Sequence, residues 1–202
     1  MTYQQNAAKT VLAIILGLVL LLTGCQTSAA IQTPMPTTST TPTATTIPTH
    51  TPTLTPTTAT GSQVGNLAPD FTLLDLNGQA VSLSSLRGKP VLLNFWATWC
   101  APCRQEMPYL QQINAEWAPK GLVLLAVDIG ESLVQVKTFL ENNGLSLPTL
   151  LDSDRTVSTR LYNITAIPTT FFIDQSGIIQ QKMVGSFPNK QAIEKYVSQI
   201  VP

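Results

Sequence analysis

Near the middle of this 202-residue chain stands the stretch Asn94-Phe95-Trp96-Ala97-Thr98-Trp99-Cys100-Ala101-Pro102-Cys103. The apolar run from Pro90 to Trp96 predicts a strand buried on both faces, because it lacks the alternation of a half-exposed strand. The segment from about Ala101 to Trp117 predicts a helix, with Pro108 inside it. The two cysteines are therefore expected where a buried strand ends and a helix begins.

A cysteine at the start of a helix is predisposed to react. Unpaired backbone N–H groups and the positive end of the helix dipole favour its thiolate, and the pKa of such a cysteine falls from about 8.5 into a range of roughly 3.5 to 7.5. We expect Cys100, nearer the strand and more exposed, to attack a disulfide, and Cys103, one turn deeper, to resolve the mixed disulfide. Pro102 suits the first helical turn, where its missing N–H has no partner to lose.

Other roles for this cysteine pair find little support in the composition. The chain has three cysteines and one histidine, His50, which lies in a Thr/Pro tract without Cys, Asp or Glu nearby. A zinc site would therefore lack its second pair of ligands. A purely structural disulfide across so short a loop removes little entropy from the unfolded chain. We predict a redox-active pair, with no metal and no cofactor.

Residues 64–202 alternate strand and helix patterns and have the size of one α/β domain. The dipeptide Asn77-Gly78 suits a turn that requires positive φ and predicts an N-terminal β-hairpin. Its strands are expected at 71–74 and 80–83. The elements expected after the cysteine helix are a strand at 122–129, a helix at 131–143, a short strand at 149–151, a helix at 154–162, strands at 169–173 and 178–184, and a helix at 189–201. This order predicts a central mixed sheet flanked by helices.

Residues 1–24 have the layout of a signal peptide, with Lys9 ahead of the apolar run Val11 to Leu22. That run of about a dozen residues is short for a membrane span, which needs roughly 20. The sequence Leu22-Thr23-Gly24-Cys25 resembles the lipobox of bacterial lipoproteins, and the resemblance implies that Cys25 becomes the lipidated first residue of the mature protein. An ordinary signal peptide, or an uncleaved anchor with an incidental cysteine, is the alternative.

Residues 25–63 are dominated by Thr and Pro, with hardly any large apolar side chain. Such a composition predicts a disordered, semi-stiff linker that cannot bury a core. Eleven basic and eleven acidic residues give the whole chain a formal net charge of zero, without a run of Lys or Arg. We therefore expect no nucleic-acid partner.

The stretch at 94–103 resembles the active site of the thioredoxin superfamily, and more narrowly that of the membrane-associated thiol-disulfide reductases of the TlpA/ResA group. The similarity runs from about Ala68 to the C-terminus and includes Ala68-Pro69-Asp70-Phe71 and Ile167-Pro168-Thr169. It implies a thioredoxin-like fold, in keeping with the order of elements above. It also implies that Pro168 follows a cis peptide bond and lines the substrate groove, where the backbone of Ile167 pairs with an incoming peptide.

Cytosolic thioredoxins carry a buried acid where this chain has Asn94, whose amide does not titrate. Glu106 instead lies three residues after Cys103 on the same helical face, where ResA-like reductases also place an acid. We expect Glu106 to modulate the thiol pKa values and to assist proton transfer, a solvated helix glutamate being the alternative. Trp99 and Pro102, which flank the reactive sulfur, are expected to contact the substrate.

These features together predict an extracytoplasmic, lipid-anchored and monomeric thiol-disulfide oxidoreductase. We expect it to reduce disulfides of proteins, among which the resemblance points to apocytochrome c, with electrons from a membrane thiol donor. An oxidase or isomerase would use the same cysteines in reverse. Peroxiredoxin-like activity is disfavoured because Leu93 and Ala97 stand where those enzymes place Pro and Thr or Ser. A non-catalytic tethered binding module is the remaining alternative.

Overall fold

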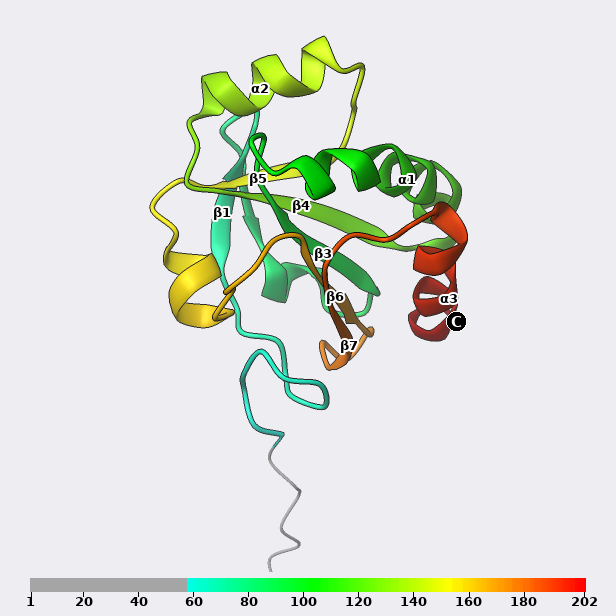
Figure 1. Ribbon diagram of the computed structural model, residues 1–202. Coiled ribbons are helices and arrows are strands. Elements are labelled where there is room, and N and C mark those ends of the chain that lie inside the picture. The colour runs from blue at the N-terminus through cyan, green and yellow to red at the C-terminus, as the bar shows by residue number, and fades with distance from the viewer. Residues whose placement is uncertain (1–57) are drawn as a thin grey trace, which may run out of the picture. The chain divides into compact units, whose positions relative to one another are not determined.

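The computed structural model of the protein describes residues 58–202. Seven strands form one mixed sheet in the order β2-β1-β5-β4-β3-β6-β7, with helices packed against it (Figure 1). The elements in chain order are β1 (Thr72–Asp75), β2 (Ala80–Ser82), the 3-10 turn η1 (Leu83–Leu86), β3 (Val91–Trp96), α1 (Ala101–Trp117), the 3-10 turn η2 (Ala118–Lys120), β4 (Val123–Ile129), α2 (Leu133–Asn142), β5 (Thr149–Asp152), the π-helical turn η3 (Thr156–Leu161), β6 (Thr169–Ile173), β7 (Ile179–Val184) and α3 (Lys190–Ile200). The predicted thioredoxin-like α/β fold is confirmed.

Strand β3 lies inside the sheet, parallel to β4 and antiparallel to β6. All six of its residues are buried. Leu92 and Trp96 pack into the cluster under the three α-helices, whereas Leu93 and Phe95 pack into a second cluster on the opposite face. The uninterrupted apolar run in the sequence is therefore explained by burial on both faces of the sheet.

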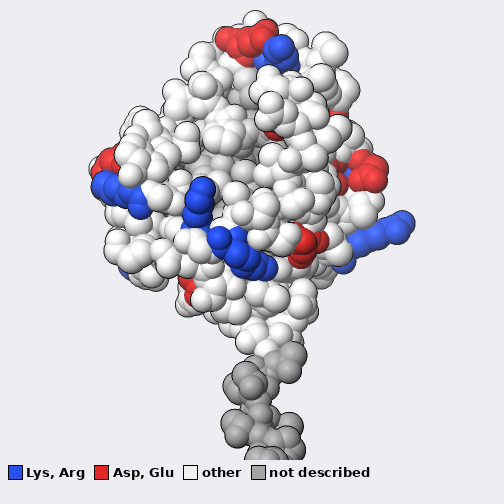
Figure 2. All heavy atoms as spheres, turned by 180° about the vertical axis from the view of Figure 1, so that it is seen from behind, with Lys and Arg blue, Asp and Glu red and all other residues white. Residues whose placement is uncertain are grey.

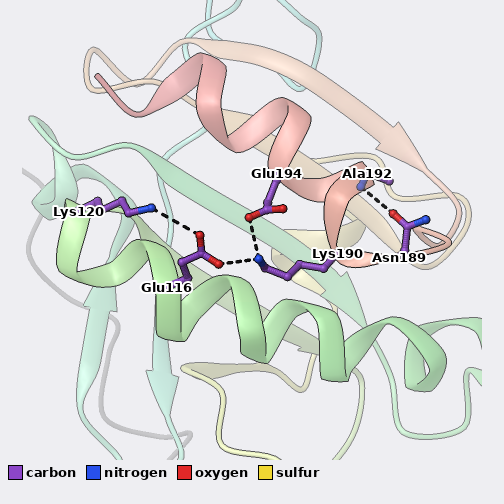
Figure 3. A network of polar contacts seen from close by, with 6 residues as sticks. All are labelled: Glu116, Lys120, Asn189, Lys190, Ala192 and Glu194. Atoms are coloured by element: carbon purple, nitrogen blue, oxygen red, sulfur yellow. Dashed lines mark hydrogen bonds and ion pairs between the residues drawn. The ribbon is translucent and has the colours of Figure 1, made fainter.

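Helices α1 and α3 pack against one another, as Figures 1 and 3 show. Lys190, at the start of α3, bridges them: its Nζ lies 2.5 Å from Glu116 of α1 and 2.8 Å from Glu194 of α3. Asn189 caps α3 by accepting a hydrogen bond from the backbone N–H of Ala192. This polar network fixes the two helices at the solvent side of the first cluster.

The predicted N-terminal hairpin is present, with β1 and β2 antiparallel and Leu73 opposite Val81. Its turn is a three-residue loop closed by the N–H of Asp75, which donates to the carbonyl of Gln79 at 2.8 Å. Only Gly78 of the Asn-Gly dipeptide has positive φ, at 79°. A single left-handed glycine is what such three-residue hairpin loops require.

Two of the predicted helices differ from the observed structure, one in its start and one in its type. Helix α2 starts at Leu133 instead of residue 131, because Ser132 and Gln135 form a reciprocal capping box. The helix expected at 154–162 is only the π-helical turn η3. The carboxylate of Asp152 accepts the N–H groups of Val157 and Ser158, at 3.1 and 2.7 Å, and so holds this turn against the end of β5.

The segment before β1 is also hydrogen-bonded. The N–H of Gly65 donates to the carbonyl of Ile179, and the N–H of Ala68 donates to the carbonyl of Gly177. Leu67 forms an antiparallel bridge with Ile178. These contacts fasten residues 65–68 beside the start of β7, which is an edge strand of the sheet. Among residues 58–202, no helix has the length and apolar character that crossing a membrane demands.

A substitution of Tyr162 tests how the segment before β1 is held against the sheet. Its fully buried hydroxyl donates to the carbonyl of Pro69 at 2.8 Å, and its ring packs against Phe95 and Phe171. Tyr162→Phe keeps the ring but leaves the Pro69 carbonyl without its donor, so we expect the free energy of unfolding to fall by about 1–2 kcal/mol. Urea denaturation measures this loss.

Tyr109→Phe is the matched control, because the Tyr109 hydroxyl makes no hydrogen bond to residues 58–202. We expect its unfolding midpoint to equal that of the wild type. Equal midpoints for both variants would show that the Tyr162 hydroxyl adds nothing to stability.

Candidate active site

The two cysteines lie at the junction of β3 and α1. Cys100 is the N-cap of α1, and its backbone is extended while that of Ala101 is already helical. The N–H of Cys103 donates to the Sγ of Cys100 at 3.2 Å, and the two residues form a disulfide. Pro102 occupies the first helical turn, as predicted. The Sγ of Cys100 thus receives an amide of the helix end, the arrangement that favours a thiolate.

Access differs between the two sulfurs in the expected sense. Cys100 is 5% exposed and Cys103 is fully buried. Trp99, which precedes them, is 62% exposed and projects at the surface of the site. An incoming disulfide therefore reaches Cys100 first.

The loop before β6 lies against Cys100. Because β6 pairs antiparallel with β3, Thr169 stands opposite Phe95 and the preceding loop faces the cysteines. The peptide bond between Ile167 and Pro168 is cis, as the resemblance implies. The Sγ of Cys100 lies 3.7 Å from the carbonyl oxygen of Ile167. Pro168 is buried and Ile167 half-buried, so the backbone of Ile167 is the part of this loop next to the reactive sulfur.

An open groove of about 450 Å³ starts beside the cysteines. Its lining comes from the ends of β3 and β4, the turn after β5 and the loop before β6. The residues that line it are Trp99, Ile129, Arg155, Ile164, Thr165, Ala166 and Ile167. Two predicted substrate-contacting residues, Trp99 and Ile167, therefore share one groove. Pro102 and the buried Pro168, which were also predicted to contact the substrate, do not line it.

Glu106 is fully buried in α1, one turn beyond Cys103. Its carboxylate accepts hydrogen bonds from the Nδ2 of Asn94 and the N–H of Phe187, both at 2.9 Å. Loss of hydration raises the pKa of Glu106 to about 7, against the lowering effect of these two hydrogen bonds. The alternative of a solvated helix glutamate is wrong, because no part of this side chain reaches solvent.

Glu131 is a site residue that the sequence reasoning missed. Its two carboxylate oxygens accept the backbone N–H and the hydroxyl of Thr98, each at 2.6 Å. This clamp holds the turn that carries Trp99 and Cys100. The N–H of Glu131 in turn donates to the carboxylate of Asp128 at 3.2 Å.

Asp128 is fully buried at the end of β4. Loss of hydration, and secondarily the neighbouring Glu131, raises the pKa of Asp128 to about 8. The sequence contains a signal for this residue: an acid inside the apolar run at 122–129 lies on a strand expected to be buried, which indicates a functional or structural role for it. Because β3 and β4 are parallel, the ends of both strands meet at one edge of the sheet, where Asp128 supports the cysteine turn through Glu131.

Residues 58–202 contain no group of three or more His, Cys, Asp and Glu arranged to hold a metal ion. Cys25 and His50 lie outside the described residues. Two carboxylates of this region accept hydrogen bonds from the protein itself. The carboxylate of Glu131 accepts the backbone N–H and the hydroxyl of Thr98, and that of Asp152 accepts two backbone N–H groups of η3.

Residues 64–182 match the model of the AhpC/TSA family. The chain belongs to this family. Curated relatives give a narrower assignment. The thiol-disulfide oxidoreductase ResA of Geobacillus kaustophilus is 42% identical over 143 residues, which cover 71% of this chain and 81% of the relative. The thiol-disulfide oxidoreductase ResA of Bacillus subtilis is 38% identical over 138 residues, covering 68% and 76%.

Solved structures agree with this assignment. A thiol:disulfide interchange protein of the thioredoxin family from Chlorobium tepidum superposes with a TM-score of 0.59 at 32% identity, covering 67% of this chain and 95% of its own. StoA from Bacillus subtilis superposes with a TM-score of 0.56 at 25% identity, covering 63% and 96%. The protein is thus a thiol-disulfide oxidoreductase similar to ResA, and the predicted class of enzyme is confirmed.

Glu106 makes the stability of this oxidoreductase depend on pH. Its pKa is about 7 in the folded protein and 4.5 without the protein environment, so between these values the folded state keeps a proton that the unfolded state has lost. The stabilising contribution is complete below pH 4.5 and is lost as pH rises to about 7. Relative to Glu106→Gln, whose side chain stays neutral, we expect the wild type to lose roughly 3 kcal/mol across this window.

Urea denaturation of the oxidised proteins at several pH values measures this difference. Glu141→Gln, which removes an exposed carboxylate of α2, is the control and should follow the wild type at every pH. A constant difference between wild type and Glu106→Gln would contradict the raised pKa.

Proposed function

We propose that this oxidoreductase reduces protein disulfides on the extracytoplasmic side of a membrane, to which a lipid on Cys25 and a Thr/Pro-rich linker tether it. The linker ends earlier than the predicted residue 63, because Ala59 and Gly61 already hydrogen-bond to Leu67. One observation carries the proposal: the Sγ of Cys100 lies between the amide end of α1 and the carbonyl of Ile167, at the start of an open groove. A protein segment laid along that groove brings its own disulfide to Cys100. The relatives named as thiol-disulfide oxidoreductases support the same chemistry.

The exchange proceeds in two displacements that together move two electrons. The thiolate of Cys100 attacks one sulfur of the substrate disulfide, forms a mixed disulfide and releases the other substrate sulfur as a thiolate. Cys103 then loses its proton and attacks the Sγ of Cys100, which frees the second substrate sulfur. The products are a substrate dithiol and the Cys100–Cys103 disulfide, which is the state of this structure.

We assign to Glu106 the role of the base that takes the proton from the thiol of Cys103. It is a carboxylate on the same buried side of α1, and its pKa of about 7 lies close to neutrality. A base of this strength accepts the thiol proton as Cys103 attacks, and the proton passes on by way of solvent to the substrate thiolate that leaves. Trp99, which lines the groove, and Pro102, which is exposed, provide substrate contacts beside Cys100.

The enzyme leaves each cycle oxidised, so a dithiol donor must return two electrons. We place this donor in the membrane to which the chain is tethered, and we propose apocytochrome c before haem attachment as a substrate, in line with the resemblance to the ResA group. The same sulfurs also permit the reverse reaction of an oxidase or isomerase, because local hydrogen bonds and partners set the potential. Peroxide reduction lacks support, since Leu93 and Ala97 stand where peroxiredoxins place Pro and Thr or Ser before the reactive cysteine.

Replacing Cys103 tests the assignment of the two sulfurs. In Cys103→Ser the mixed disulfide on Cys100 has no resolving thiol, so we expect covalent adducts with substrate proteins. These adducts should be cleaved by a reducing agent. Non-reducing gels followed by mass spectrometry of the adducts measure this. Cys100→Ser, which keeps Cys103, is the matched control and should capture far less. Adducts of equal yield in both variants would contradict Cys100 as the attacking residue.

The tether is tested separately from the chemistry. If Cys25 is lipidated, cells fed a fatty-acid analogue should label the wild type, and Cys25→Ala should carry no label and move to the soluble fraction. The isolated Cys25→Ala protein should still reduce disulfides, because Cys25 stands 75 positions before Cys100 in the sequence. An unlabelled wild type would remove the lipid from the proposal.

A further inference from the structure

We propose that Arg155 makes this enzyme prefer disulfides with an acidic side chain next to the substrate cysteine. The proposal deepens the function proposed above and rests on it, since it concerns the same groove. Of the residues that line the groove, Arg155 alone carries a charge, and the others are apolar or neutral. A substrate segment therefore meets a single cation beside an otherwise uncharged surface.

The position of Arg155 is set by its backbone. It has φ of 60°, in the left-handed region that few residues other than glycine adopt. Its N–H donates to the carbonyl of Asp152 at 3.0 Å, and its own carbonyl accepts the N–H of Thr159 at 2.9 Å. The turn between β5 and η3 therefore fixes the backbone position from which the Arg155 side chain lines the groove.

The Arg155 side chain packs directly over Gly130, which lies just after β4. A Cβ on Gly130 would lie 2.3 Å from the Nε of Arg155, so no larger residue fits there without moving the arginine. Gly130 also has φ of 81° and donates its N–H to the carbonyl of Asp152 at 3.0 Å. The ends of β4 and β5 are thus tied together with Arg155 lying over the glycine.

The guanidinium has no partner within the part of the chain that the structure describes. None of the ion pairs among residues 58–202 includes Arg155, and its side chain donates none of their hydrogen bonds. The nearest acid in the sequence, Asp154, accepts the N–H of Thr156. The exposed guanidinium is a planar fork of donors that matches a carboxylate, which it binds through two parallel hydrogen bonds.

Bulk charge cannot produce the same preference, because the chain has a formal net charge of zero. On the face shown in Figure 2, groups of both signs are spread over the surface with wide uncharged areas between them. Selection by charge would then depend on the local cation at the groove.

Three disulfide-linked peptides that differ only beside the cysteine, with Glu, Gln or Lys, test the proposal. The reduced full-length protein should reduce the Glu peptide roughly two- to fivefold faster than the Gln peptide in kcat/KM, the effect of one ion pair with an exposed arginine. The Lys peptide should be slowest, and added salt should narrow the range. In Arg155→Gln the ratio of Glu to Gln rates should fall to about one, and in Arg155→Glu the order of Glu and Lys should invert.

Arg160→Gln is the matched control, because Arg160 is an exposed cation of the same turn that does not line the groove. It should keep the wild-type ratio. Equal loss in Arg155→Gln and Arg160→Gln would assign the effect to general charge and overturn the proposal, as would a wild type with no preference among the peptides. A wild type that reduces none of the three would instead overturn the proposed function.

Discussion

The whole site depends on β3 being buried on both faces. A strand in this position cannot shift its register without exposing one apolar cluster, so its carboxyl end is a fixed point in the molecule. Cys100 follows that end by four residues and begins α1. The sulfur therefore stays over the amide end of the helix, because the apolar clusters on both faces of β3 hold the strand in one register.

The other parts of the site reach this fixed point from the neighbouring strands. The end of β4 contributes Glu131, which clamps Thr98, and Gly130, on which Arg155 rests. The antiparallel β6 starts beside the same edge and brings the carbonyl of Ile167 to Cys100. The turn after β5 carries Arg155 itself. The ends of β3, β4, β6 and β5 thus supply the reactive sulfur, its positioning, the substrate contact and the charge, while the sheet fixes their relative positions.

The fold and the reactive pair could be predicted from the sequence because their signals are local. The apolar run of β3 and the spacing of Cys100 and Cys103 each depend on neighbouring residues. The roles of Glu131 and Arg155 depend on residues far along the chain, Thr98 in one case and Gly130 in the other. The periodicity of residues 131–143 predicts Glu131 inside the helix, whereas the capping box of Ser132 and Gln135 starts α2 at Leu133 and leaves Glu131 free to bind Thr98.

The attachment of residues 65–68 to β7 has a mechanical consequence. Any pull that arrives through the preceding chain acts first on the hydrogen bonds that join Ala59 and Gly61 to Leu67, and then on those of Gly65 and Ala68 beside the start of this edge strand. Strand β7 is separated from β3 by β6. The load would then be borne at the border of the sheet, where a few bonds can open and close again, while the junction that holds Cys100 remains unstressed.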